Sequence, residues 1–356
     1  MRRLSIKAMV NQFFRSSPPS PFRTVTRISR DGMPDTVVQL QAKQFSGQWV
    51  HAPQTPYDAN IPDDLPTSLT LVTWNVDFSK PYFHERLTAA LNHLEKGLTN
   101  DKGGKPPPCL ILLQEIQVEA FDTLLTHPWV REWFMVVPGR PNEGWPQGAW
   151  YGTVTLVARS VKLTASTCVH FGESWMHRNA LVTDVLLGGA EPRAHVLRVI
   201  NTHLESLPEG TPRRVVQLKV IAELLEQGKT ESGGVGGIVG GDMNAIAPSD
   251  ATLPEQNGLL DAWQEKRKRD GKEVEGEDND EEGMTWGYQP PCQFPPGRLD
   301  KVLYTASDAF EVKNIQKLGM DVKLTPAEDD SEWVSDHFGL LCQVEARQAT
   351  SQEARL

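Results

Sequence analysis

The strongest constraint on this chain is a recurring junction at which a short apolar run ends in polar residues. Five junctions carry the motifs Thr73-Trp74-Asn75, Leu113-Gln114-Glu115, Asn201-Thr202-His203-Leu204-Glu205-Ser206, Gly241-Asp242-Met243-Asn244 and Ser335-Asp336-His337. Short continuously apolar runs are typical of strands that are buried on both faces. Polar residues just past the carboxyl ends of such strands are where open α/β sheets place their ligands. We therefore expect the five strand ends to converge on one cleft.

Helical spacing appears between the strands. Phe83–Leu98 and Pro212–Glu226 each repeat apolar side chains at the spacing of an amphipathic helix. Strands are expected at Leu69–Val76, Cys109–Leu113, Gly152–Ala158, Leu181–Leu187, Val196–Thr202 and Gly236–Gly240. Because strands outnumber helices and β-α-β units are mixed with meanders, the pattern predicts two sheets with helices outside, an α/β sandwich.

The polar residues at the junctions form a coherent chemical set. Five of them offer only oxygen ligands: Asn75, Glu115, Asp242, Asn244 and Asp336. Such a set suits a hard cation that keeps several waters, such as Mg²⁺ or Mn²⁺. His203 and His337 could donate hydrogen bonds to a phosphoryl oxygen, and Asp300 could hold one of these imidazoles in orientation. A metal ion, a carboxylate that positions the water and a histidine that stabilises the oxyanion are the parts that hydrolysis of a phosphodiester requires.

Each motif alone has a simpler structural explanation. An Asn at the end of a strand is usually a turn residue, and Gly-Asp-x-Asn is more often a tight turn than a site. A Ser-Asp-His triplet could simply cap the segment that follows it. The functional interpretation depends on all the motifs occurring together, each after an apolar run.

In this order, the motifs resemble the endonuclease/exonuclease/phosphatase superfamily from about Leu69 to Val344. Within it, the chain is most similar to the 5′-tyrosyl-DNA phosphodiesterase family, which shares the T-W-N, L-Q-E, G-D-x-N and S-D-H motifs. His203–Ser206 matches the H-L-E-S of that family, and Met176–Asn179 resembles another of its segments. The ending Asp336–Leu341 is similar too, with Phe338 where a Trp is expected. The resemblance implies a four-layered α/β sandwich of two mixed β-sheets flanked by helices.

The resemblance also implies a role for each matching position. Cation binding falls to Glu115, Asp336 and Asn75. Asp242 would position or deprotonate the attacking water with help from Asn244, while His337, oriented by Asp300, and His203 would stabilise the phosphate. Substrate binding is implied for Ser206, Asn75, Arg178 and Trp286; a partly buried packing role is the alternative for Trp286.

The implied activity is that of a Mg²⁺-dependent phosphodiesterase, with Mn²⁺ as an alternative cofactor. It would hydrolyse 5′-phosphotyrosyl or similarly blocked DNA ends, single-stranded or frayed, and leave a 5′-phosphate during DNA repair. Four alternatives stay open: an abasic-site endonuclease, an RNA exonuclease, a phosphodiesterase of inositol phosphates or sphingolipids, and a non-catalytic DNA-binding scaffold. We expect a monomer that acts without a membrane.

Composition divides the chain into an arm, a catalytic domain and a tail. Residues 1–66 are predicted to be a basic, Pro/Ser-rich and largely disordered lead-in with one edge strand at Thr36–Leu40, and residues 348–356 a tail. The arm does not look like the N-terminal ubiquitin-binding helical module of the resembling family. Because it is Arg- and Ser-rich and initially free of acids, a mitochondrial transit peptide is an alternative to a nuclear or cytoplasmic location.

The catalytic domain is expected at residues 67–347, interrupted by a charged loop insertion at 266–283. Acids in this insertion would repel DNA, whereas Lys266–Arg269 could contact phosphates. The net charge of −10 argues against a protein that coats nucleic acid through a broad positive face. No run of apolar residues is long enough for a membrane span, and the scattered cysteines predict a reducing compartment.

Overall fold

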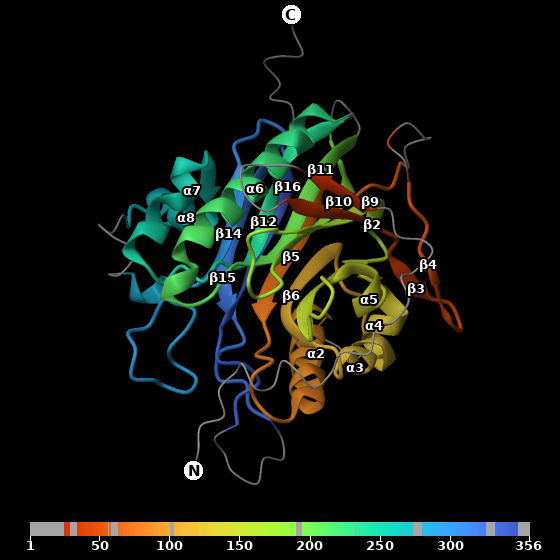
Figure 1. The fold of residues 1–356 in the computed structure, drawn as a ribbon. Helices are drawn as coiled ribbons and strands as arrows, with labels where there is room; N and C mark the ends of the chain where they lie inside the picture. The colour runs from red at the N-terminus through yellow and green to blue at the C-terminus, as the bar shows by residue number, and fades with distance from the viewer. Residues whose placement is uncertain are drawn as a thin grey trace, which may run out of the picture.

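The computed structural model describes residues 34–55, 57, 63–99, 103–189, 194–231, 233–272, 280–324 and 332–347, together with the backbone of 25–28. Two eight-stranded sheets pack face to face, and helices cover their outer faces (Figure 1). The predicted four-layered α/β sandwich is confirmed.

The first sheet contains the strands that carry His203, Asp242 and Asp300. Its order is β1 (Val25–Ile28), β2 (Asp35–Leu40), β9 (Lys162–His170), β10 (Asn179–Gly188), β11 (Ala194–His203), β12 (Gly234–Asp242), β14 (Asp300–Thr305) and β13 (Leu259–Asp261). Only β11 and β12 are parallel neighbours in this sheet.

The second sheet contains the strands that carry Asn75 and Glu115. Its order is β15 (Phe310–Leu318), β16 (Gly339–Ala346), β5 (Ser68–Asn75), β6 (Cys109–Gln117), β8 (Tyr151–Ala158), β7 (Phe134–Val137), β3 (Lys43–Phe45) and β4 (Trp49–His51). Here β5 and β6 are the parallel pair. Each sheet therefore has one β-α-β unit at its centre, and the helices of these two units are the two that the sequence predicts.

The helices lie in two outer layers. The longer ones are α2 (Phe83–Thr99) and α6 (Thr211–Thr230), and the shorter ones are α3 (Phe121–Thr126), α4 (Pro128–Trp133), α5 (Pro141–Gly144), α7 (Leu253–Gln256) and α8 (Ala262–Arg269). Helix α6 lies along β11, β12 and β14 of the first sheet. Helices α2, α3 and α4 lie on the side of the second sheet (Figure 1).

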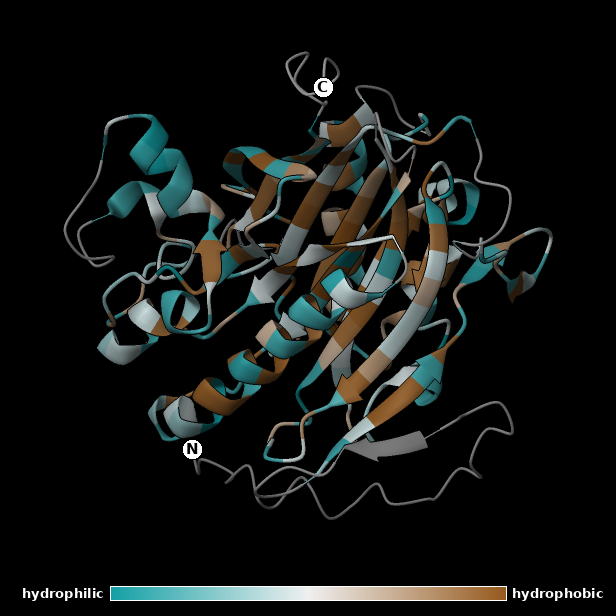
Figure 2. Ribbon diagram, turned by 90° about the horizontal axis from the view of Figure 1, so that it is seen from above, coloured by the Kyte–Doolittle hydropathy of each residue, from teal (hydrophilic) through white to brown (hydrophobic). Residues whose placement is uncertain are grey.

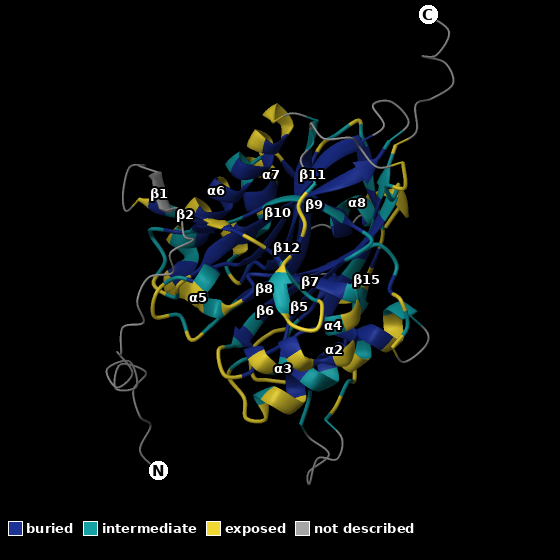
Figure 3. Cartoon of the chain, turned by 90° about the vertical axis from the view of Figure 1, so that its right-hand side faces the viewer, coloured by how far each residue is buried: buried dark blue, intermediate teal, exposed yellow. Residues whose placement is uncertain are grey.

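The core has two parts because the sheets are covered on both faces. One apolar cluster fills the space between the sheets and extends under α2, and the other lies between the first sheet and α6. All residues of β10 and β11 are buried, and the charged residues among them, Asp184 and Arg198, form an ion pair at 2.8 Å (Figures 2 and 3). Each fully buried Leu or Ile side chain contributes about 2 kcal/mol to folding.

The sandwich begins earlier in the chain than the predicted boundary at residue 67. Strand β2 pairs with β9 as well as β1, so it is an inner strand and not the predicted edge strand. Strand β3 pairs with β7 of the other sheet. The strand predicted at Thr36–Leu40 is present as β2, but the expectation of a largely disordered lead-in was wrong for residues 41–51, which carry β3 and β4. Val38, Leu40 and Ala42 supply buried side chains that polar neighbours mask in the sequence. Most of residues 1–33 lie outside the described part of the chain.

The predicted charged loop at 266–283 also needs correction where it is described. Lys266–Arg269 form the last half of α8, and three of them are paired with acids: Lys266 with Asp270, Arg267 with Glu282 and Lys268 with Glu265. Arg269 donates to the carbonyl oxygen of Val312 at 3.3 Å. Asp280 is buried and accepts a hydrogen bond from Trp263 Nε1. These basic side chains therefore have partners within the fold, which disfavours the suggested contact with phosphates. Residues 273–279 lie outside the described residues.

In the described part of the chain, no helix has the length and apolarity that a membrane crossing requires. All four cysteines are free thiols, and three of them are buried: Cys109, Cys168 and Cys342.

Candidate active site

Strand register brings three of the predicted site residues in the first sheet to the same level. His203 pairs with Asp242 across the parallel strands β11 and β12, and Asp242 pairs with Asp300 across β12 and β14. Each residue is the first or last of its strand. The predicted convergence of strand ends is therefore built into the pairing of this sheet.

The glycine of the Gly-Asp-x-Asn motif is required by the close approach of β12 to β11. A Cβ atom on Gly241 would lie 1.9 Å from the carbonyl oxygen of Thr202, which no side chain can tolerate. The absence of a side chain lets the next residue, Asp242, lie beside His203. Asn244 closes the turn with a φ of 47°, and its backbone N–H donates to Asp242 Oδ1.

Asn75 and Glu115 come from the second sheet, where an irregularity directs Glu115 into the site. The pairing of β6 with β8 shifts register between Leu113 and Ile116, and Glu115 has a φ of 62°. A β-bulge re-aims a side chain in this way, and strained backbone is often found at functional sites. The Glu115 carboxylate accepts hydrogen bonds from Asn75 Nδ2 at 3.0 Å and from Phe78 N at 2.9 Å.

The segment that carries His337 is held from two directions. Ser335 Oγ donates to the carbonyl oxygen of Asn75 at 2.6 Å and accepts from His337 N at 3.0 Å. The carbonyl oxygen of His337 accepts from Trp74 Nε1 and Gln289 Nε2. The Ser and Trp of the sequence motifs thus have structural roles, fixing the adjacent Asn and His.

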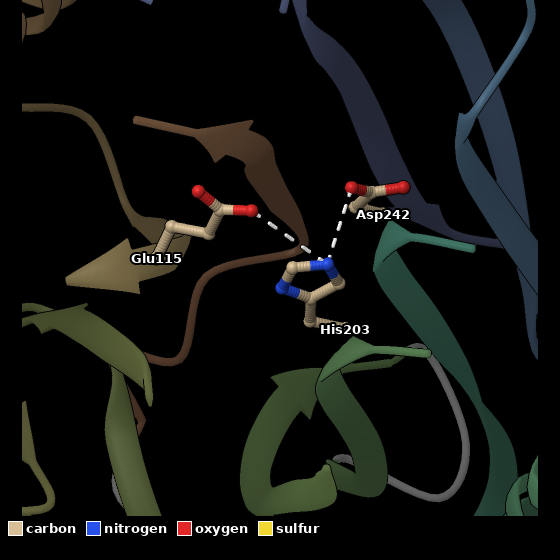
Figure 4. A group of neighbouring side chains, drawn as sticks. All are labelled: Glu115, His203 and Asp242. Atoms are coloured by element: carbon tan, nitrogen blue, oxygen red, sulfur yellow. Dashed lines mark ion pairs between the residues drawn. The ribbon is translucent and has the colours of Figure 1, made fainter. Parts of the chain in front are cut away.

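Asp242 is shared by two compact acid–histidine groups, one with Glu115 and His203 (Figure 4) and one with Asp300 and His337. Its Oδ2 accepts from Asn75 Nδ2 at 3.0 Å and lies 3.3 Å from His203 Nε2 and 3.8 Å from His337 Nε2. His203 Nε2 also lies 3.8 Å from Glu115 Oε1. One carboxylate oxygen therefore faces two imidazoles and an amide.

His203 is held neutral by Arg178. An arginine only donates, so the contact of 2.8 Å from Arg178 Nη1 makes His203 Nδ1 the acceptor and leaves the proton on Nε2, toward Asp242. Burial, followed by the positive charge of Arg178, lowers the pKa of His203 well below its ordinary value. Arg178 also donates to Ser206 Oγ at 2.9 Å.

His337 has the opposite surroundings. Its Nδ1 lies 2.8 Å from Asp300 Oδ2, and Asp336 and Asp242 are near its Nε2. Burial opposes the charged form, but the three carboxylates outweigh burial and raise the pKa of His337 well above its ordinary value. This imidazole is therefore a cation that can donate from Nε2.

The carboxylates of the site are poised to bind a positive ion. Burial raises the pKa of Glu115 to about 7 and that of Asp242 to about 6. Ligand atoms of Glu115, His203 and Asp242 lie within 4.8 Å of one another. A divalent cation would relieve this crowding of negative charge, so the oxygen-rich donor set fits a hard metal ion.

The structure brings the predicted site residues together, with Asp336 and Trp286 at the edge. Asp336 belongs to neither compact acid–histidine group, and its Oδ2 accepts from Trp286 Nε1 at 3.1 Å. Asn244 Nδ2 donates to the carbonyl oxygen of Leu204 at 3.0 Å. The catalytic and binding roles of these residues stay predictions.

The sequence analysis assigned no role to two residues that lie next to the site, Tyr151 and Glu205. The ring of Tyr151 lies 5.4 Å from the Arg178 guanidinium and 6.5 Å from the His203 ring. Glu205 is fully buried and accepts from Ser174 Oγ, Trp175 N and Gln217 Nε2. For Glu205, the sequence signal was an acid within the His203–Ser206 motif. For Tyr151, at the start of β8, the sequence gives no signal of a position near the site.

A family model described as the Endonuclease/Exonuclease/phosphatase family matches residues 72–337, well over half of the chain. The chain belongs to this family. The sequence-based identification is thereby confirmed, and the matched region spans all five motifs.

Two curated relatives are similar to part of the chain. The chain is 27% identical over 117 residues to the 5′-tyrosyl-DNA phosphodiesterase of Caenorhabditis briggsae and 27% identical over 118 residues to that of Caenorhabditis elegans. Each match covers 33% of this chain and 31% of the relative, so the match spans about a third of the length of either.

The similar solved structures cover more of the chain. TDP2 from C. elegans matches with a TM-score of 0.58 at 19% identity, over 81% of this chain and 77% of that one. TDP2 from D. rerio, complexed with a single-strand DNA product, gives 0.57 at 18% identity, over 79% and 100%. The human Nocturnin catalytic domain gives 0.52 at 18% identity, over 80% and 96%. At these identities the likeness establishes the fold.

Proposed function

We propose that this chain is a divalent-cation-dependent phosphodiesterase that hydrolyses 5′-phosphotyrosyl ends of DNA and leaves a 5′-phosphate. The observation that carries the proposal is the pair of imidazoles around Asp242, one neutral and one cationic, beside the carboxylate of Glu115. This arrangement combines a base for water with two donors for a phosphate. The family and the curated relatives, which are 5′-tyrosyl-DNA phosphodiesterases, support the choice of substrate.

Proton transfer is the proposed role of Asp242. With a pKa raised to about 6, its carboxylate is ionised at neutral pH and basic enough to accept a proton from an attacking water. Asn75 Nδ2 and Asn244 N hold its two oxygens. This leaves the carboxylate little rotational freedom, so the water would be bound in one position.

Stabilisation of the pentacovalent phosphate is assigned to the two imidazoles. His337 is cationic and oriented by Asp300, so its Nε2–H can donate to an oxygen on which negative charge accumulates. The neutral ring of His203 supplies a second Nε2–H. Because both rings are already oriented in the protein, little reorganisation accompanies the reaction.

Mg²⁺, or Mn²⁺ in its place, would be held by Glu115 with Asn75 nearby and Asp336 at the outer edge. When bound, the ion supplies Lewis acidity toward a phosphoryl oxygen and neutralises part of the charge of the site. Tyrosine is a good leaving group because its phenol has an ordinary pKa of about 10, so strong acid assistance is unnecessary.

Single-stranded or frayed DNA is the proposed form of the substrate, supported by the single-strand product in the D. rerio TDP2 structure. Ser206, Arg178 and Trp286 are proposed to contact it. A nuclear or cytoplasmic location fits DNA repair; a mitochondrial one and the monomeric state stay predictions from the sequence.

The proposal is tested with two matched oligonucleotides in the presence of Mg²⁺, one 5′-phosphotyrosyl and one with an internal abasic site. We expect release of tyrosine, its loss with EDTA and its loss in the Asp242→Asn protein. Cleavage at the abasic site alone would keep the metal chemistry and overturn the tyrosyl substrate. Inertness toward both would redirect the search to RNA and phosphorylated lipids.

A further inference from the structure

Four exposed apolar residues lie in the segments that meet at the start of α6. They are Trp175, Leu207, Val215 and Val216, whose exposed fractions are 67%, 56%, 42% and 41%. We call these four residues, together with Arg213, the Trp175 patch. Exposed apolar groups that cluster in this way mark interaction surfaces more often than isolated ones do.

Side-chain contacts join the segments of the patch. The guanidinium carbon of Arg213 lies 3.0 Å from the centre of the Trp175 ring, and Arg214 Nη1 donates to the carbonyl oxygen of Leu207 at 2.9 Å. Val215 and Val216 follow directly on the same helix. The loop after β9, the segment after β11 and the first turns of α6 therefore meet here.

Hydrogen bonds to a buried carboxylate hold the backbone beneath the patch. Glu205, buried and in the segment after β11, accepts from Trp175 N at 2.9 Å and from Ser174 Oγ at 2.8 Å. Leu207 has a φ of 68°, a strained conformation for a side chain that is nevertheless left exposed. A pre-positioned, exposed Trp loses little entropy on binding, which is the property of an interface hot spot.

The patch adjoins the catalytic residues through Arg178. The loop that begins with Ser174 and Trp175 continues to Arg178, whose guanidinium donates to His203 Nδ1 and Ser206 Oγ. Ser206 directly precedes Leu207. The two segments that carry Trp175 and Leu207 are therefore continuous with the residues that contact His203.

The chemistry of the patch favours a peptide over a DNA strand. A polynucleotide track needs repeated cations for successive phosphates, whereas the five side chains of the patch include one cation, which lies over the Trp175 ring. Trp, Leu and Val match apolar side chains instead. Tyrosine attached to DNA through its hydroxyl still belongs to a polypeptide at both backbone ends, so an enzyme acting on this bond meets peptide.

We propose that the Trp175 patch binds apolar side chains of the peptide that carries the scissile phosphotyrosine. The inference rests on the proposed function, which it deepens by adding the protein part of the adduct to the substrate. It assigns Trp175 and Leu207 to specificity, outside the groups that contact the reacting phosphate.

The test compares two substrates that differ only in the leaving group: an oligonucleotide with a 5′-phosphotyrosine, and the same oligonucleotide whose tyrosine is flanked by Leu and Val in a short peptide. Trp175→Ala should lower kcat/KM about tenfold for the peptide adduct and leave the tyrosine substrate unchanged. Leu207→Gly should act in the same direction, and because Gly relieves the positive φ, misfolding would not explain its effect. An equal loss of kcat/KM on both substrates would mean that the patch acts on DNA or through Arg178, and would overturn the proposal. An unchanged kcat/KM on both substrates would overturn it as well.

Tyr82→Ala provides the matched control, because Tyr82 is 56% exposed and lies after β5 in the other sheet. It should affect neither substrate selectively. Binding of both oligonucleotides to the Asp242→Asn protein, followed by fluorescence anisotropy, separates the two hypotheses. If the wild type cleaves neither substrate, tighter binding of the peptide adduct that is lost with Trp175→Ala supports the patch while the proposed function fails. Equal binding of both oligonucleotides overturns the patch.

Discussion

His203 and His337 approach the same oxygen of Asp242, at 3.3 and 3.8 Å, but they are held by opposite partners. Arg178 donates to His203 and keeps it neutral, whereas Asp300 lies against His337 and keeps it charged. Burial is common to both rings, so the charge of the neighbour decides the protonation state. The comparison teaches that two identical side chains in one site can serve as a neutral and a cationic donor.

The largest expected effect separates the two rings directly. His337→Ala should reduce kcat about a thousandfold and His203→Ala about a hundredfold, because a hydrogen bond from a cation to a phosphate is roughly twice as strong as one from a neutral donor. Single-turnover rates with a 5′-phosphotyrosyl oligonucleotide measure both, and circular dichroism checks that both variants fold. Equal losses would contradict the difference in charge.

Replacing Glu115 tests the His203 side of the site, where Glu115 Oε1 lies 3.8 Å from that ring. Glu115→Gln should raise the Mg²⁺ concentration for half-maximal activity about a hundredfold, since one anionic ligand becomes neutral. In the wild type this concentration should rise as the pH falls through about 7, because protons then compete for the carboxylate whose pKa is raised to that value. Mg²⁺ titrations at several pH values measure both effects. An unchanged Mg²⁺ requirement in the variant would remove Glu115 from the metal site.

Asp300→Asn removes the partner that charges His337. The pKa of His337 should fall toward its ordinary value, so activity would be lost as the pH rises through this lower pKa, while the wild type stays active to higher pH. At alkaline pH we expect about a tenfold loss for each unit by which the pKa falls. The pH profile of kcat/KM measures the shift, and a uniform loss at every pH would indicate a purely structural role.

The smallest effect is expected from the partner of the neutral ring. Arg178→Met frees Nδ1 of His203, so part of the population carries its proton there and Nε2 can no longer donate; we expect about a tenfold loss at neutral pH. The ratio of variant to wild-type activity should rise at lower pH, because a doubly protonated ring carries Nε2–H in any case, whereas protonation of Asp242 and Glu115 in acid affects both proteins alike. Arg178→Lys keeps the charge and should fall between the variant and the wild type. A ratio that falls further in acid would contradict this tautomer.

The sequence predicted which side chains would lie together better than the contacts among them. Asn75, Glu115, Asp242 and His337 could be expected in one cluster because each follows an apolar run or resembles a family motif, and they do lie together. The bulge that directs Glu115 inward could not be predicted, since it depends on the pairing of β6 with β8. The guanidinium on His203 likewise requires the register of β10 with β11, which brings Arg178 from a separate loop.

The edges of the fold were the least predictable part. A strand was predicted at Thr36–Leu40, but not its inner position in the sheet. Residues 41–51 were predicted to be a polar lead-in because their strands are short and no side chain of β3 or β4 is fully buried, so tertiary pairing rather than local pattern makes them strands. Lys266–Arg269 read as a loop because charge dominates their sequence, although Asp261 caps α8 by accepting from Trp263 N at 3.0 Å. Asp336 was assigned to the metal, and whether it reaches the ion stays a prediction.

Asn75 has a mechanical consequence. Its single amide nitrogen donates to Glu115 on its own sheet and to Asp242 on the facing sheet. It therefore links the predicted catalytic groups of the two sheets. Any loosening of the two layers at this end lengthens these bonds while both layers remain intact. We therefore expect the activity to depend on the spacing between the two sheets. On gentle heating, activity should be lost before the strands of either sheet separate.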